Sequence, residues 1–123
     1  MSQEAQSSIL ERNKQIVRNF AEDVLNRHDL AAVDKYIPGA EGLKQYLGEY
    51  FAGHPDSSTT IDQIVAEGDK VFVLFIGTAT NKQTGKKVTI KSADVYRIVN
   101  GMFVEHWDVV EASTFPNRRI SEL

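Results

Sequence analysis

The stretch that decides the fold is VYRIVNGMFVEHWDVV, residues 95–110. Two runs rich in β-branched and aromatic residues, the types that favour strands, flank the dipeptide Asn100-Gly101. Asn-Gly is typical of a two-residue type I′ turn, because both positions of that turn need a positive φ. The stretch therefore predicts an antiparallel hairpin.

A two-residue turn also predicts which residues face each other. Val99 is then opposite Met102, and the pairs continue with Glu105 opposite Tyr96, Trp107 opposite Asp94, and Asp108 opposite Ala93. Paired residues share a face of the sheet, so Glu105 and Trp107 would point one way and His106 and Asp108 the other. One β-bulge would exchange the faces beyond it, so the pairing is best defined close to the turn.

The rest of the chain divides into helical and strand-like segments. Apolar residues at helical spacing predict helices over residues 8–27, 30–36 and 40–52, with Asp29 as the N-cap of the second. Four segments have the composition of strands: residues 59–67, 70–80, 86–99 and 102–110. Helices followed by closely connected strands predict an α+β fold with an antiparallel sheet.

Length and composition limit the class of protein. The 123 residues fit one domain, with a core over about residues 8–112 and polar tails at 1–7 and 116–123. A net charge of −3 gives no basic surface for nucleic acid or anionic membrane, and the absence of cysteine excludes disulfides and thiolate chemistry. With no apolar signal core and no run long enough to span a bilayer, we expect a cytoplasmic protein.

Three side chains of the hairpin are candidates for proton transfer. Burial raises the pKa of a carboxyl group, so an acid among apolar neighbours can exchange protons near neutral pH. Asp108 is the leading candidate, with Asp94 and His106 as partners. The alternatives are structural: Asp108 could pair with Arg97 or Lys91, Asp94 could accept from a lysine or from the Trp107 indole, and His106 could be an edge-strand histidine. Glu105 fits a salt bridge or an oligomer contact.

Several aromatic residues could line a cavity near these groups, or could simply be core: Phe20, Tyr36, Tyr46, Tyr50 and Trp107. His28 and His54 lie far apart without ligand spacing, so the sequence predicts no metal site. There is no Gly-x-Ser-x-Gly elbow and no glycine-rich phosphate loop.

Four phrases in this order resemble the SnoaL-like polyketide cyclase group of the NTF2-like superfamily: NKQIVRNFAEDVLNRHDLAAVDKYI, GAEGLKQYLGEYFAGHPD, IDQIVAEGDKVFVLFIGTAT and SADVYRIVNGMFVEHWDVVEA. The resemblance covers about residues 10–112. It implies a cone-shaped α+β fold, in which a curved antiparallel sheet wraps around helices, with an apolar pocket between them. It also implies a homodimer formed through the outer sheet face.

The resemblance implies a role for Asp108, because the cyclases and the related limonene epoxide hydrolases keep a catalytic Asp at that position. The sequence departs from the cyclases at two places. Asp94 stands nearest to a histidine of the preceding strand, and the segment after Tyr36 that usually carries a pocket histidine is shortened.

These observations predict a cofactor-free cyclase or isomerase that binds a small apolar carbonyl or polyketide-like substrate. Asp108 would move the proton, and Asp94 or His106 would orient or polarise the carbonyl or a water. The alternatives are a non-catalytic ligand-binding or dimerisation module, and an epoxide hydrolase using the same Asp.

Overall fold

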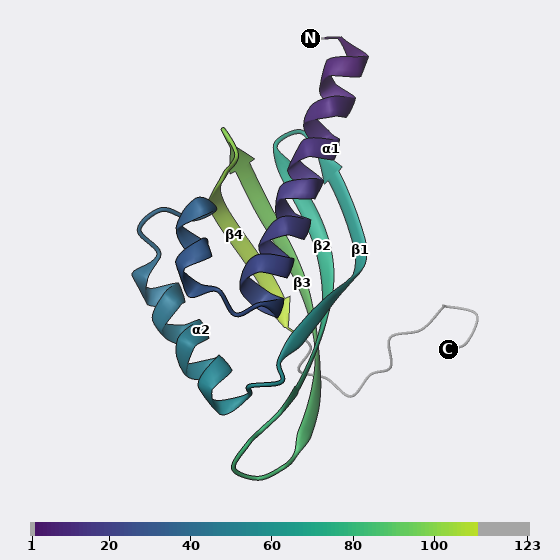
Figure 1. Cartoon of the computed structure of the whole chain (residues 1–123). Helices are drawn as coiled ribbons and strands as arrows, with labels where there is room; N and C mark the ends of the chain where they lie inside the picture. Colours follow the sequence, from purple (N-terminus) through teal and green to yellow (C-terminus); the bar gives the residue numbers. More distant parts are fainter. Residues whose placement is uncertain (1, 111–123) are drawn as a thin grey trace, which may run out of the picture.

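The chain folds as a layer of helices against one face of a curved four-stranded antiparallel sheet (Figure 1). A computed structural model describes residues 2–110. Its elements are, in chain order, α1 (Gln3–Phe20), the π-helical turn η1 (Ala21–Asn26), the 3₁₀ helix η2 (Leu30–Lys35), α2 (Glu41–Gly53), β1 (Ser58–Glu67), β2 (Lys70–Thr80), β3 (Lys87–Val99) and β4 (Met102–Val110). The strands lie in the order β1-β2-β3-β4, so the predicted α+β architecture is confirmed. None of the described helices combines the length and apolar content that a membrane crossing requires.

The turn at Asn100-Gly101 forms as the sequence predicts. Its two residues have φ values of 52° and 78°, the left-handed conformation that a type I′ turn needs. Val99 pairs with Met102, and the next pair is Ile98 with Phe103. The part of the hairpin next to the turn is therefore confirmed.

Beyond Phe103 the predicted register is wrong by one residue, because β4 contains a bulge. Val104 is the extra residue, and Glu105 pairs with Arg97 instead of Tyr96. The remaining pairs shift accordingly: His106 with Tyr96, Trp107 with Val95, and Asp108 with Asp94. A bulge exchanges the faces of the residues beyond it. His106 and Asp108 therefore share the inner, helix-covered face with Asp94, and Trp107 lies on the outer face.

The first helix begins earlier than the sequence predicts. Ser2 caps α1 by accepting a hydrogen bond from the Ala5 backbone N–H at 3.1 Å, so residues 3–7 are helical and do not form a polar tail. The predicted N-cap Asp29 is confirmed, since its carboxylate accepts from the Ala32 N–H at 3.2 Å. The predicted polar tail at 116–123 lies outside the described residues.

The core lies between α1, η1 and η2 and the inner face of the sheet. Phe20 contacts the rings of Tyr36 and Phe103 edge-on, with centroids 5.4 and 5.2 Å away. Each such pair contributes about 0.5–1.5 kcal/mol beyond the burial of its surface. The Tyr36 carbonyl accepts from the Phe103 N–H at 2.8 Å, and the Tyr36 hydroxyl donates to Asp23 at 2.7 Å. These two bonds attach Tyr36, at the end of η2, to β4 and to η1.

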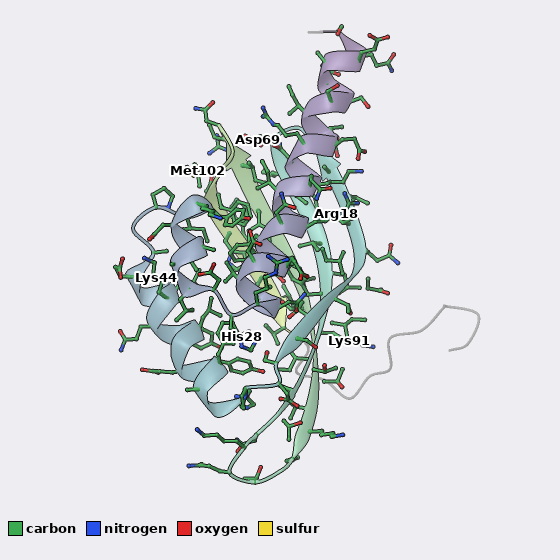
Figure 2. All side chains as sticks on the ribbon, viewed as in Figure 1. Arg18, His28, Lys44, Asp69, Lys91 and Met102 are labelled. Carbon is green, nitrogen blue, oxygen red and sulfur yellow. The ribbon has the colours of Figure 1, made fainter. Side chains whose placement is uncertain are left out.

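Two side chains connect the helical layer to the start of β1. Asn26 accepts from the Thr59 N–H at 2.6 Å and donates to the Thr59 carbonyl at 3.0 Å. His28, labelled in Figure 2, stacks on Phe51 with ring centroids 3.9 Å apart and binds the Ser57 carbonyl through Nε2 at 2.8 Å. These contacts fix the backbone of Ser57 and Thr59, where the chain enters the sheet.

Candidate active site

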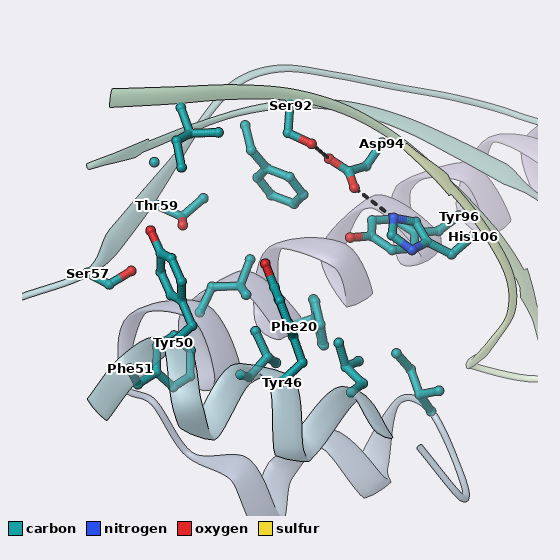
Figure 3. A pocket seen from close by; sticks show the side chains of 17 residues that line it. Phe20, Tyr46, Tyr50, Phe51, Ser57, Thr59, Ser92, Asp94, Tyr96 and His106 are labelled. Atoms are coloured by element: carbon teal, nitrogen blue, oxygen red, sulfur yellow. Dashed lines mark hydrogen bonds and ion pairs between the residues drawn. The ribbon is translucent and has the colours of Figure 1, made fainter. Parts of the chain in front are cut away.

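A cavity of about 260 Å³ lies between α2 and the inner face of the sheet (Figure 3). This volume lies slightly below the range of about 300–1,000 Å³ that is usual for ligand sites. Apolar side chains from the helices and strands make most of its wall: Phe20, Leu43, Leu47, Phe51, Phe75 and Ile90. The cavity is therefore suited to a small, mainly apolar molecule.

A hydrogen-bonded carboxylate and imidazole form one end of this cavity. Asp94 is only 6% exposed, and its Oδ1 lies 2.7 Å from Nε2 of His106. The other carboxylate oxygen accepts from the Ser92 hydroxyl at 2.6 Å. Both Asp94 and His106 line the cavity (Figure 3). A buried carboxylate with two partners is held in one orientation, so it can hold the imidazole in one orientation too.

Asp108 lies beside this pair but does not line the cavity. It faces Asp94 across the β3–β4 ladder and is exposed to solvent. Like charges directly opposite each other destabilise a sheet, and a ring nitrogen of His106 lies close to both carboxylates. Oxygens of Asp94 and Asp108 and a ring nitrogen of His106 all lie within 4.8 Å of one another.

The same three side chains could hold a divalent cation, because carboxylates and imidazole are ligands of several such metals. The sequence gives no spacing motif for this group. Its members meet only because the bulge brings three positions of two strands to one face.

Tyr96 is a site residue that the sequence reasoning missed. Its ring stacks on His106 with centroids 4.7 Å apart and planes at 12°, and it lines the cavity. Burial raises the pKa of Tyr96 well above its ordinary value, and the charges of Asp94 and Asp108 raise it further. The phenol therefore stays protonated and can donate a hydrogen bond. Its spacing of two residues from Asp94 along a strand was the available signal.

The aromatic residues predicted to line a pocket fall into two groups. Phe20, Tyr46 and Tyr50 line the cavity. Tyr36 instead belongs to the core, where its hydroxyl is used by Asp23. Trp107 is 48% exposed on the outer face, because the bulge turned it away from the cavity. The prediction for these last two residues needs correction.

Arg97, predicted as an alternative partner of Asp108, instead forms ion pairs with two other carboxylates. Arg97 contacts Glu105 at 2.9 Å and Asp69 at 2.8 Å, on the outer face. The prediction of a salt bridge for Glu105 is thereby confirmed. Asp94 accepts from neither a lysine nor the Trp107 indole, since its two oxygens bind Ser92 and His106.

Comparison with known proteins gives a consistent fold. A model of the SnoaL-like domain matches residues 12–106. A search of curated proteins finds no match. Among solved structures, a candidate polyketide cyclase from Acidithiobacillus ferrooxidans is 26% identical, with 82% of this chain and 89% of that chain covered and a TM-score of 0.72.

Two further structures share the fold at lower identity. AclR, a candidate hydroxylase from Streptomyces galilaeus, is 23% identical over 83% of this chain and 76% of its own, with a TM-score of 0.75. IdmH, a candidate polyketide cyclase from Streptomyces antibioticus, is 21% identical over 80% and 91%, with a TM-score of 0.72. At this identity the two structures show the fold alone. The expected NTF2-like cone is confirmed.

Proposed function

The chain belongs to the SnoaL-like domain family, and on that premise we propose that it is a cofactor-free cyclase or isomerase acting on a small apolar carbonyl or polyketide-like substrate. The observation that carries the proposal is the 2.7 Å contact of Asp94 with His106 at one end of an apolar cavity. A positioned acid–base pair beside an apolar cavity is an arrangement that supports proton transfer.

The Asp94–His106 pair carries the proton. Asp94 is buried and accepts the N–H of His106 Nε2, so Nδ1 of the same ring is left as the proton acceptor. His106 is the more accessible of the two, with 45% of its side chain exposed against 8% for Asp94. His106 removes a proton from the carbon next to a carbonyl, and the electron pair of that C–H bond forms an enolate. Asp94 holds the imidazole in the required tautomer.

Tyr96 and Asp108 support the charges that this step creates. The Tyr96 phenol donates a hydrogen bond to the enolate oxygen, as an oxyanion-stabilising group does. Asp108 adds a second carboxylate near the new imidazolium. The enolate carbon then attacks a second carbonyl, and His106 returns the proton to the new alkoxide, which closes a ring. Return of the proton to a different carbon gives an isomerisation instead.

A non-catalytic ligand-binding module is the second candidate. It is favoured by the exposure of Asp108, the residue at the position where the cyclases keep their acid. Epoxide hydrolysis, in which the same acids would activate water, is a third use of the site. All three use the same cavity: the cyclase or isomerase takes the proton from carbon, the epoxide hydrolase takes it from water, and the binding module moves none.

Deuterium exchange separates the cyclase or isomerase from the binding module without knowledge of the natural substrate. The protein is incubated in heavy water with a panel of cyclic ketones, and exchange next to the carbonyl is followed by NMR. We expect exchange by the wild type and a loss of about a hundredfold or more in His106→Gln. Glu105→Gln, the neighbouring change on the outer face, is the control. Ligands that bind without exchange would support the binding module.

We also propose a homodimer formed through the outer face. An apolar row crosses all four strands there: Val65 opposite Phe72, Phe72 opposite Val95, and Val95 opposite Trp107. Val65, Phe72 and Trp107 are 59%, 43% and 48% exposed. A continuous apolar strip of this kind on a sheet is typical of a protein–protein interface.

A further inference from the structure

The cavity has a second polar end, opposite Asp94 and His106, that the proposed proton transfer does not use. Three hydroxyl-bearing residues gather there: Tyr50 from α2, Ser57 from the loop, and Thr59 from β1 (Figure 3). Apolar side chains such as Phe20, Leu47 and Phe75 occupy the wall between the two ends. A ligand that fills the cavity therefore meets polar groups at both ends and apolar groups between them.

The hydroxyl end is held rigidly by contacts outside the cavity. Asn26 binds both backbone groups of Thr59, at 2.6 and 3.0 Å, and His28 binds the Ser57 carbonyl at 2.8 Å. The Tyr50 ring stacks on His54 with centroids 4.3 Å apart. Positions fixed in this way before a ligand arrives lose little conformational entropy on binding.

The described residues that line the cavity include no lysine and no arginine. Burial raises the pKa of Tyr50, so its phenol is also neutral at ordinary pH. A carboxylate or phosphate at this end would lose its hydration and find only neutral donors, which is costly for a buried charge. At the other end it would meet the carboxylate of Asp94. The chemistry of both ends thus rejects anions.

Gly77 provides room for a ligand at the hydroxyl end. It pairs with Thr59 on the inner face and lines the cavity. A Cβ atom at this position would lie 3.8 Å from Thr59 Oγ1 and 3.7 Å from the Ser58 carbonyl, which are ordinary contacts. A side chain could therefore be accommodated by the fold, but it would occupy space beside the Thr59 hydroxyl.

We propose that Tyr50, Ser57 and Thr59 form a subsite for a neutral hydroxyl or carbonyl group of the ligand, at the end of the cavity opposite Asp94 and His106. Resting on the proposed function, this makes the substrate an uncharged carbonyl compound with an apolar body and a second neutral oxygen function at its far end. Acids, phosphates and other anionic carbonyl compounds are excluded.

Three bicyclic ketones test the subsite by calorimetric binding: 1-tetralone, 6-hydroxy-1-tetralone and 1-tetralone-6-carboxylate. With the wild type we expect the hydroxy compound to bind about three- to tenfold more tightly than 1-tetralone, the usual gain from one added neutral hydrogen bond. The carboxylate is expected to bind at least about tenfold more weakly than the hydroxy compound.

Variants assign this preference to the subsite. Thr59→Val and Gly77→Ala should each reduce the preference for the hydroxy compound to about twofold or less and leave 1-tetralone binding within about twofold. Thr60→Val is the matched control, since Thr60 is the next residue of β1 and pairs with Ile76 on the outer face. It should retain the full preference.

Two outcomes would overturn the subsite. One is binding of the carboxylate as tight as that of the hydroxy compound, and the other is equal weakening of both neutral ketones by Thr59→Val. Deuterium exchange on the same complexes separates this proposal from the proposed function. If the wild type prefers the hydroxy compound but catalyses no deuterium exchange, only the enzymatic function is contradicted. If it catalyses exchange but shows no preference for the hydroxy compound, only the subsite is contradicted.

Discussion

The two faces of the β3–β4 hairpin differ in chemistry although their residues alternate along the same strands. The inner face brings Asp94, Tyr96 and His106 to one end of an apolar cavity. The outer face presents Val95 and Trp107 in an apolar row across the sheet. The difference shows that one hairpin can supply both a polar site and an association surface, provided the register keeps them apart.

The bulge at Val104 determines which residues of β4 lie on the inner face and which lie on the outer face. Without it the chain as numbered would have paired Trp107 with Asp94, and His106 would have shared a face with Val95. With it, His106 stacks on Tyr96 and contacts Asp94 at 2.7 Å. Bulges are frequent next to functional sites because they re-aim side chains in this way.

The largest expected effect separates the two carboxylates of the inner face. Asp94→Asn should lower turnover about a hundred- to a thousandfold, because the neutral amide removes the charge that stabilises the imidazolium, and its NH₂ group can donate to Nε2 and select the wrong tautomer of His106. Asp108→Asn should lower it only about tenfold, since that carboxylate is exposed and acts through its charge alone. Steady-state rates on a substrate that passes the exchange screen measure both. An equal or greater loss in Asp108→Asn would return the leading role to Asp108.

The next effect concerns the outer face. Trp107→Glu should weaken the proposed dimer by about 2–4 kcal/mol, because it places a charge within the apolar row. Analytical ultracentrifugation across a concentration series measures this loss. Glu105→Gln, on the same face outside the apolar row, should leave association nearly unchanged. A wild-type protein that sediments as a monomer at high concentration would exclude the dimer.

A smaller effect, on the free energy of unfolding, is expected at Tyr36 in the core between the helices and the sheet. Burial, and then the hydrogen bond and charge of Asp23, raise the pKa of Tyr36 from 10.0 to about 12. Folding thus favours the protonated phenol, so the stabilisation is complete below pH 10 and is lost as the pH rises through about 12. Tyr36→Phe should lower the free energy of unfolding at pH 7 by about 1–2 kcal/mol, mainly by leaving Asp23 without its donor.

Chemical denaturation between pH 7 and pH 11.5 measures this effect. The difference in stability between wild type and Tyr36→Phe should shrink as the pH approaches the upper limit. Tyr46→Phe is the control, since Tyr46 is 64% exposed and should show no such convergence. A difference that stays constant over the whole range would mean that ionisation of Tyr36 does not destabilise the fold.

Much of the fold was predictable because its signals are local. The Asn100-Gly101 turn, the Asp29 cap and the bounds of β2 and β4 each depend on a few neighbouring residues. The early start of α1 was missed because its polar first turns carry no apolar periodicity and are stabilised by the Ser2 cap. Local propensity and capping thus predict where the helices and strands lie in the sequence, but not which side chains of different elements contact each other.

The site was predictable only as a set of residue types. Asp94, His106 and Asp108 were identified as candidates, but their mutual contact depends on one unpaired residue in β4. No composition signal distinguishes Val104 from the apolar strand residues around it, so the bulge could be suspected but not located. The error at Trp107 follows from that, whereas Tyr96 shares a face with Asp94 in either register and could have been identified from its spacing. A pairing error of one residue changes the face of every side chain beyond it.

The smallest effect is expected from deletion of Val104, and it tests the bulge most directly. Removal of the extra residue leaves Phe103 opposite Ile98 and Glu105 opposite Arg97 in an unbroken ladder, so every later pair keeps its partner. We therefore expect the deletion to lower the free energy of unfolding by about 1 kcal/mol or less and to retain turnover within a few-fold.

Insertion of an alanine after Val104 is the opposite change: it forces either a larger bulge or a slipped register that turns His106 outward. Amide hydrogen exchange and NOE contacts between β3 and β4 distinguish the larger bulge from the slipped register. Turnover lost in the deletion but kept in the insertion would mean that the bulge does not set the face of His106.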